Sequence, residues 1–196
     1  ALSIVAGPEA PRLERFAAQQ AAAQLGRLFG VKTAATAGEL PASGKVILVG
    51  SPATNPLVEQ AAAGAWPELS DQGHALKSCT LAGRPVLVAG GGSPQATLWA
   101  VYELGQRLGI RSLLSGDVYP AQPPPLELDQ FDLVLEPSLL QRTWRTINDF
   151  PIGPEAWGLE EHRRVLCQLA KLKFNRVLLS VYPWQPFVHY EFAGVQ

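Results

Sequence analysis

A strand, a polar loop, a helix and a second strand follow one another without interruption between residues 142 and 185, and no other stretch constrains the fold as strongly. The first strand is predicted at residues 143–147, and a loop with two prolines and a glycine follows it. From Leu159 onward, apolar residues recur at helical spacing between charged ones, which predicts an amphipathic helix. Residues 177–181 are almost entirely apolar, so we expect a strand that is buried on both faces.

Two strands joined by a crossover helix are expected to be parallel, with a right-handed connection. In such units, ligands bind beyond the carboxyl ends of the strands. Here the residues at those ends are polar or aromatic: Asn148 and Asp149 after the first strand, and Tyr182, Trp184 and Gln185 after the second. We therefore expect these side chains to share one edge of the sheet.

The side chains at this edge are of the types that bind saccharides. Aromatic rings contact the apolar faces of pyranose rings, whereas amides and carboxylates bind hydroxyls, and Trp157 in the first loop adds a further ring. Arg145 lies near the end of the first strand and suits a substrate carboxylate, although an internal salt bridge would look the same in the sequence. Packing between loops is an open alternative for Trp157 and Trp184.

Hydrolysis of a glycosidic bond usually requires two carboxyl groups, one protonated and one ionised. The carboxylates near the predicted edge are Asp149, Glu155 and Glu191. Enzymes built on parallel barrels take their catalytic groups from several strand ends, so no catalytic pair can be assigned from this stretch. For Asp149, capping of a loop or helix is an alternative to contact with sugar hydroxyls.

Strands and helices alternate in the first part of the chain. Strands are predicted near residues 2–6, 32–37, 45–49, 74–81 and 84–89, and helices near 11–30, 56–63 and 94–109. The order β, α, β, β, α, β, β, α predicts helices layered against a mixed sheet, an α/β sandwich. We expect Trp66 and Trp99 in its core.

A proline-rich connection at residues 120–125 precedes one more predicted strand, 131–135, which either closes the first domain or begins the next. We place the boundary near Glu136 and Pro137, so that residues 1–136 form an accessory α/β domain and residues 137–196 begin a second domain. A closed parallel barrel needs eight strands and about 250 residues. The single β-α-β unit here cannot close such a barrel, so we expect residues 137–196 to be an incomplete second domain.

Composition and charge argue against several classes of partner. Of 196 residues, 47% are hydrophobic, enough for a large core. The net charge is -1 and there is no basic cluster, so we expect no nucleic acid and no acidic membrane surface as partner. The longest apolar runs are strand-length, so no membrane span is expected. The N-terminus lacks Met and a basic segment ahead of an apolar run, which suggests a mature or trimmed sequence.

Signals for cofactors, metals and disulfides are weak. Three glycines, Gly90 to Gly92, join a predicted strand to a helix, as in phosphate-binding loops, but Gln95 stands where the dinucleotide fingerprint needs Gly or Ala. The three histidines are widely spaced. We expect no cofactor and no metal. Cys167 lies in the amphipathic helix and is expected to be a buried thiol.

Several segments resemble carbohydrate-active enzymes. Residues 90–104, followed by Leu108, Gly109 and Ile110, look like the last helix of the accessory N-terminal domain in α-glucuronidases of glycoside hydrolase families 67 and 115 and in β-N-acetylhexosaminidases of family 20. Residues 116–120 (GDVYP) and 142–149, which end in Ile-Asn-Asp, look most like family 115. Trp157 and residues 169–175 also resemble the segment that opens the barrel in family 115. Phe150 departs from that pattern, since a further acidic residue is expected there.

The resemblance implies a non-catalytic accessory domain followed by a TIM barrel that hydrolyses glycosidic bonds. It also implies an oligosaccharide or polysaccharide substrate, a catalytic pair mostly outside these residues, and a secreted or periplasmic location. Residues 1–196 alone would then be inactive. The alternatives are a non-catalytic glycan-binding or scaffold module and a nucleotide-binding α/β protein.

Overall fold

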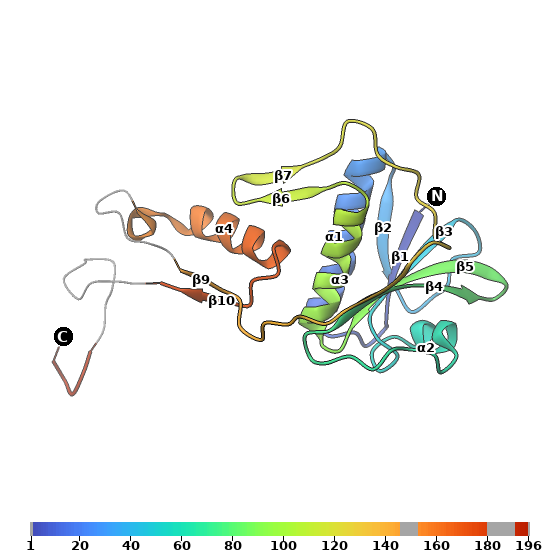
Figure 1. Ribbon diagram of the computed structural model, residues 1–196, viewed down its shortest axis with the longest axis horizontal. Coiled ribbons are helices and arrows are strands. Elements are labelled where there is room, and N and C mark those ends of the chain that lie inside the picture. Colours follow the sequence, from blue (N-terminus) through green and yellow to red (C-terminus); the bar gives the residue numbers. More distant parts are fainter. Residues whose placement is uncertain (1, 146–152, 180–190, 196) are drawn as a thin grey trace. The chain divides into compact units, whose positions relative to one another are not determined.

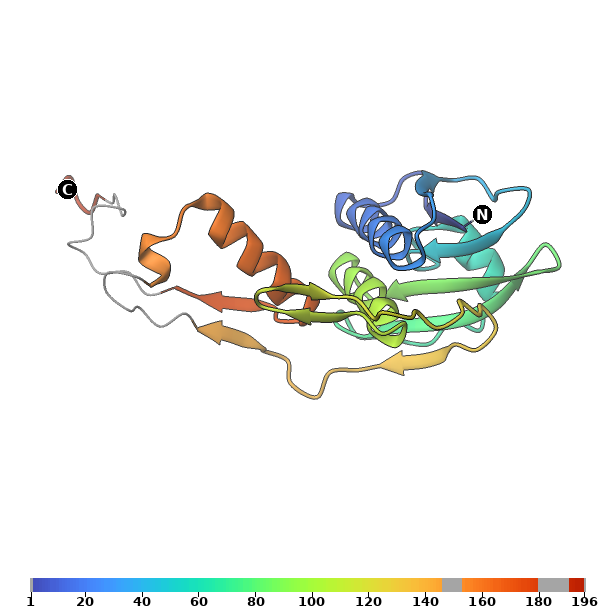
Figure 2. The same cartoon turned by 90° about the horizontal axis from the view of Figure 1, so that it is seen from above.

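The computed structural model describes residues 2–145, 153–179 and 191–195 (Figure 1). Six strands form one sheet in the order β2-β1-β3-β5-β4-β8, and Figure 2 shows them stacked from β2 to β8. Strands β1, β2, β3 and β5 are parallel, and β4 is antiparallel to both of its neighbours. The predicted mixed sheet is therefore confirmed. The strands are β1 (Leu2–Ala6), β2 (Thr33–Ala37), β3 (Lys45–Val49), β4 (His74–Leu81), β5 (Arg84–Gly91) and β8 (Asp132–Leu135).

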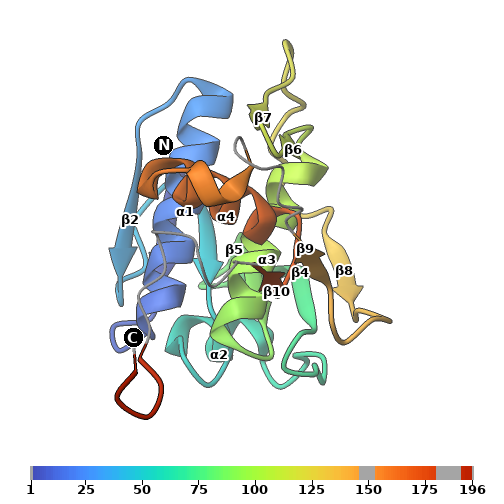
Figure 3. The ribbon, with the colours of Figure 1, turned by 90° about the vertical axis from the view of Figure 1, so that its left-hand side faces the viewer.

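Three helices cover this sheet: α1 (Arg12–Phe29), α2 (Pro56–Ala62) and α3 (Pro94–Arg107). Helices α1 and α3 lie side by side (Figures 1 and 3). Val58 of α2 packs with Leu48 and Val88, which alternate along their strands with Ile47 and Leu87. Because successive side chains of a strand point to opposite faces, α2 covers one face, and Ile47 and Leu87 point to the other. All of these side chains are fully buried, as expected for strands covered on both faces.

Local sequence signals explain where the helices begin and end. Asn55 and Ser93 cap α2 and α3, since their side chains accept hydrogen bonds from Leu57 N and Ala96 N, both at 3.1 Å. A proline stands in the first turn of each of these helices. Gly30, with φ of 64°, ends α1 in the left-handed region. The predictions for these helices are confirmed.

Strand β8 closes the first part of the chain, because it pairs with β4 along the edge of the six-stranded sheet. Glu136 follows it and accepts hydrogen bonds from Ser70 Oγ at 2.6 Å and from Ser70 N at 2.9 Å. These bonds hold the pKa of Glu136 below its ordinary value. Trp99 is 1% exposed, as predicted, whereas Trp66 is half-buried against the core cluster of α2.

The chain divides into two compact units. The first comprises Ala1–Ser112 and Asp117–Leu140, and the second comprises Leu113–Gly116 and Gln141–Gln196. Two short strands, β6 (Arg111–Leu113) and β7 (Gly116–Val118), form a separate pair. The second unit contains β9 (Thr143–Arg145), the 3-10 turn η1 (Pro154–Ala156), α4 (Leu159–Lys171) and β10 (Arg176–Leu178). No helix among the described residues is long and apolar enough to cross a membrane.

Strands β9 and β10 are parallel, with Val177 opposite Trp144, so the predicted orientation is confirmed. The expected burial is wrong for the described chain, because Leu178 and Leu179 are 41% and 54% exposed. Among the described residues β10 pairs only with β9, so its other edge has no neighbour in the sheet.

The expected burial of Cys167 is also wrong, since this residue is exposed. It lies one turn from Arg163 and Lys171 on the charged side of α4, and the helix buries only Gln168 and Leu169. Position on the helix therefore outweighs the general tendency of free cysteine to be buried.

Candidate functional site

The candidate site lies at the carboxyl ends of β9 and β10, which finish opposite each other at the pair Arg145 and Leu178. Five of the predicted binding residues lie outside the described residues: Asn148, Asp149, Tyr182, Trp184 and Gln185. The carboxylate of Glu155 is likewise not described, although its backbone belongs to η1. The structure therefore places two of the predicted binding residues, Arg145 and Trp157.

Arg145 is the last residue of β9, and its side chain is exposed. The preceding residue, Trp144, packs edge-to-face against Phe174, with ring centroids 5.7 Å apart. Because adjacent residues of a strand point to opposite faces, Arg145 lies on the face away from this aromatic pair. Within the described residues, Arg145 forms no ion pair, so the internal salt bridge considered from the sequence is not seen there.

Arg142 fastens the opposite, amino ends of the two strands. Its backbone N donates to Asn175 Oδ1 at 2.8 Å, and its Nε donates to Lys173 O at 2.7 Å. Its carbonyl accepts from Asn175 N at 3.1 Å and from Arg176 N at 3.3 Å. Partial desolvation lowers the pKa of Arg142, which nevertheless keeps its charge at neutral pH.

Arg142 thus positions β9 and β10 rather than facing a ligand at their carboxyl ends. The sequence interpretation did not identify this role. The sequence signal from which this role could have been inferred is Asn175, which follows the turn after α4 and stands directly before β10.

Trp157 follows η1 and donates its backbone N–H to Pro154 O at 3.2 Å. Its ring lies 5.5 Å from the His162 ring, centroid to centroid, at an interplanar angle of 59°. The side chain is half-buried, so one part of the ring packs on the first turns of α4 and another part is accessible. This geometry agrees with the packing alternative and leaves ring surface for a ligand.

The glycine-rich end of β5, which leads into α3, is explained by close backbone packing. A Cβ at Gly90 would lie 2.0 Å from Gly50 O, and one at Gly92 would lie 1.9 Å from Ser70 O. A Cβ at Gly91 would lie 2.5 Å from Ala96 C, so backbone atoms occupy the space beside all three glycines, and Ser93 caps the helix that follows. The glycines therefore need no phosphate ligand to account for them, which removes the main support for nucleotide binding.

Among residues 2–145, 153–179 and 191–195, no group of three or more His, Cys, Asp or Glu side chains is placed to hold a metal ion. The chemistry that the described site supplies is that of an exposed guanidinium at a strand end and a half-exposed indole in the following loop. Side chains of these types are suited to binding and orienting a ligand.

Comparison with protein-family models and with curated proteins gives no match. Among solved structures, the chain is similar to one described as a novel family GH115 4-O-methyl-α-glucuronidase with specificity for decorated arabinogalactans. The TM-score is 0.66 at 19% sequence identity, and the alignment covers 90% of this chain and 24% of that chain. The chain thus spans about a quarter of that protein's length. At this identity the likeness shows a shared fold, and at that level it supports the resemblance to family 115.

Proposed function

We propose that the chain is part of a glycoside hydrolase of the α-glucuronidase type. Residues 1–136 are a non-catalytic accessory domain, and residues 137–196 begin the TIM barrel that carries the chemistry. The observation that carries this proposal is the parallel unit β9-α4-β10 directly after an α/β sandwich, in a chain whose fold resembles that of a family GH115 enzyme.

Exposed apolar side chains in the second unit support a larger surrounding structure. Leu159 and Leu166 on α4 are 72% and 48% exposed, and Leu178 on β10 is 41% exposed. In a barrel, neighbouring strands and helices cover such positions, so their exposure in the described chain is what a partial barrel would show.

Substrate binding is assigned to the carboxyl ends of β9 and β10. In a barrel the face opposite the helices is the interior, and Arg145 lies on the face away from Trp144. There its guanidinium would bind a uronic acid carboxylate through two parallel hydrogen bonds. The amide and carboxylate groups, Asn148, Asp149 and Gln185, would bind hydroxyls, and the aromatic rings, Trp157, Tyr182 and Trp184, would contact sugar faces.

Catalysis in the whole protein would use a protonated carboxyl group to assist the leaving oxygen and an ionised one as nucleophile or base. These groups would come mostly from strand ends outside residues 1–196, so this chain alone would bind but not hydrolyse. A secreted or periplasmic location, where plant-derived or microbial polysaccharides are available, fits this function.

The test compares the full-length protein with residues 1–196 on glucuronosides derived from xylan and on N-acetylhexosaminides. We expect release of glucuronic acid by the full-length protein only. Arg145→Ala should lower kcat/KM by about ten- to hundredfold, since a hydrogen-bonded charge is lost, and Arg145→Lys should recover part of that loss. Arg176→Ala, at the amino end of the same strand pair, is the matched control and should leave kcat/KM nearly unchanged.

Turnover of no glycoside would refute the enzymatic function. Binding of the same oligosaccharides without turnover would favour the glycan-binding module instead. Equal losses of kcat/KM for Arg145→Ala and Arg176→Ala would show that Arg145 affects folding rather than substrate binding.

A further inference from the structure

Residues 126–140 lead to the division between the two units, and side chains of the first unit fasten this segment at several points. Lys45 Nζ donates a hydrogen bond to the carbonyl of Leu126, which is 8% exposed. Ser78 N donates to Phe131 O at 2.7 Å, and Ser78 Oγ accepts from Phe131 N at 2.8 Å. Strand β8 then pairs with β4. The segment is therefore bound to the first unit before it reaches the division.

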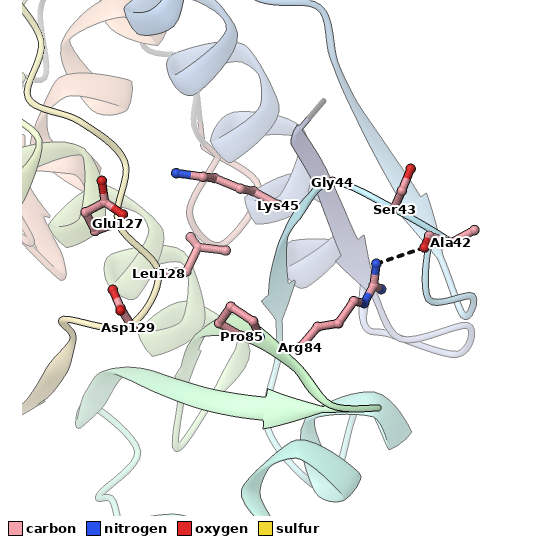
Figure 4. Close-up of a pocket in the computed structure, with 9 residues that line it drawn as sticks. All are labelled: Ala42, Ser43, Gly44, Lys45, Arg84, Pro85, Glu127, Leu128 and Asp129. Atoms are coloured by element: carbon pink, nitrogen blue, oxygen red, sulfur yellow. Dashed lines mark hydrogen bonds between the residues drawn. The ribbon is translucent and has the colours of Figure 1, made fainter.

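A pocket of about 380 Å³ lies beside this segment, at the amino ends of β3 and β5 (Figure 4). On its other side, Arg84 donates to the carbonyls of Pro41 and Ala42 at 2.6 and 3.0 Å. Lys45 and Arg84 are thus each bonded to backbone carbonyls, and the two carboxylates of residues 127–129 in the same lining balance their charge. The basic side chains hold the surrounding segments in place, and the balanced charge selects neither an anion nor a cation.

The carboxylate of Glu136 provides the next fastening along the segment. Its Oε2 accepts from Ser70 Oγ at 2.6 Å, and its Oε1 accepts from Ser70 N at 2.9 Å. Hydrogen bonds to an ionised carboxylate are stronger than those between neutral groups, and here both oxygens are used. A Cβ at Gly73 would lie 1.9 Å from Glu136 Oε1, so the absence of a side chain there leaves room for the carboxylate.

The turn that receives Glu136 is itself anchored in the first unit. Ser70 Oγ accepts from Gln72 N at 3.2 Å and from Gly73 N at 3.0 Å, which closes the turn. Gly92 N, directly after β5, donates to Gly73 O at 3.0 Å. Because the last six residues of β5 are buried, the turn is joined to the core of the sheet.

A second hydrogen bond extends the contact beyond Glu136. Gln72 Nε2 donates to Leu140 O at 3.0 Å, and Leu140 is the last residue of the first unit. Between these two fastenings Pro137 restricts the backbone. One turn, residues 70–73, therefore bonds both ends of the segment that connects β8 to the division.

We propose that the turn at residues 70–73 is a clamp that fixes the path of the chain from β8 to Leu140, with Glu136 as its principal positioning residue. The first unit then directs where the second unit begins, and the connection is not a free linker. The inference goes beyond the proposed function and does not depend on it, because every contact of the clamp lies within the first unit.

Thermolysin digestion of the full-length protein tests the clamp, because a protease cuts a bound segment mainly after that segment opens locally. Glu136→Ala removes both bonds to Ser70, so we expect cutting near Leu139 and Leu140 to become at least about tenfold faster. Glu136 is exposed, so Tm should change little. The matched control is Glu127→Ala, which removes an exposed carboxylate of the same segment outside the clamp and should keep the wild-type rate.

Variants of Ser70 test the other half of the contact. Ser70→Ala should also speed up cutting, and Ser70→Thr, which keeps a hydroxyl, should recover much of the wild-type rate. In Glu136→Ala/Ser70→Ala the rate should rise by less than the product of the two single effects, because both substitutions remove one shared contact. Hydrogen exchange at the Ser70 amide should be faster in Glu136→Ala, since this amide donates to the carboxylate.

Three results would overturn the inference. The first is a wild-type cutting rate in Glu136→Ala, and the second is a double variant in which the two single effects simply multiply. The third is a lower Tm of Glu136→Ala together with equally faster cutting within residues 2–112, which would show general unfolding in place of local opening. Glycoside turnover plays no part in these measurements, so they and the test of the proposed function fail separately.

Discussion

Glu14 is a carboxylic acid inside the first unit, 1% exposed in the first turn of α1. Its Oε1 accepts a hydrogen bond from Thr97 Oγ1 of α3 at 3.2 Å. Burial raises the pKa of Glu14, and hydrogen bonds from Thr54 and Thr97 oppose this rise only in part. The folded protein therefore favours the protonated acid above the ordinary pKa of a glutamate.

Glu14→Gln should remove a pH dependence of stability. Because the pKa is raised on folding, the folded state binds more protons than the unfolded state between the ordinary and the raised value, so stability falls as pH rises through that window. The neutral glutamine amide does not titrate, so it does not lose stability as pH rises, and its oxygen can still accept a hydrogen bond from Thr97 Oγ1. We expect similar stability for both proteins at low pH and a gain for the variant of about 1 kcal/mol at neutral pH.

Urea unfolding at a series of pH values from 4 to 8 measures this difference. Glu9→Gln, in the exposed turn before α1, is the control and should follow the wild-type curve. Parallel pH profiles for the wild type and Glu14→Gln would contradict the account of Glu14.

At the scale of elements, the second unit shows how a strand and a helix can be correctly predicted while their burial is not. Leu169 on α4 is 2% exposed, whereas Leu166 on the same helix and Leu178 on β10 are largely accessible. Helical and strand periodicity depends on local sequence, but burial depends on which other elements are present.

Leu178→Thr tests whether neighbouring strands cover β10 in the full-length protein. Threonine is β-branched, a shape that strands favour, so in residues 1–196 we expect a change within about 0.5 kcal/mol. In the full-length protein, a covered leucine should cost about 2–4 kcal/mol on replacement. Leu169→Ala, at a buried position, is the control and should destabilise both proteins. Urea unfolding measures the change in unfolding free energy in residues 1–196 and in the full-length protein. An equally small change in both would count against the barrel.

At the scale of the whole molecule, the chain passes from the first compact unit to the second between Leu140 and Gln141. Leu139 and Leu140, next to the division, are 66% and 73% exposed, whereas β1, β3 and β5 in the first unit are almost entirely buried. Exposed connections are common points of proteolytic cleavage, and thermolysin cuts beside large apolar side chains such as these leucines.

Limited digestion with thermolysin should therefore cut near Leu139 and leave a resistant fragment that retains β8. Mass spectrometry of the time course identifies the fragment. A first cut within residues 2–112 would show that the six-stranded unit is not independently stable.

Much of the fold could be predicted because its signals are local. The prolines and caps at Asn55 and Ser93 define helix starts, and the turn at Gly83 joins β4 to β5. The position of the strand at 131–135 could not be decided, because pairing with β4 joins segments more than fifty residues apart. Within the candidate site, the strand-end position of Arg145 was predictable from spacing, but the contact between Trp157 and His162 was not.

The sequence by itself determined the order of strands and helices, the mixed sheet and the parallel direction of β9 and β10, because periodicity, caps and crossover rules depend on residues close together in the chain. Only the tertiary structure decided that Gly90 to Gly92 serve backbone packing, that Glu14 is buried, and that Cys167 and Leu178 are exposed. It also brought Lys45, Arg84 and Glu127 to one pocket from three distant segments. Each of these depends on which surfaces meet when the chain folds, and no local pattern encodes that.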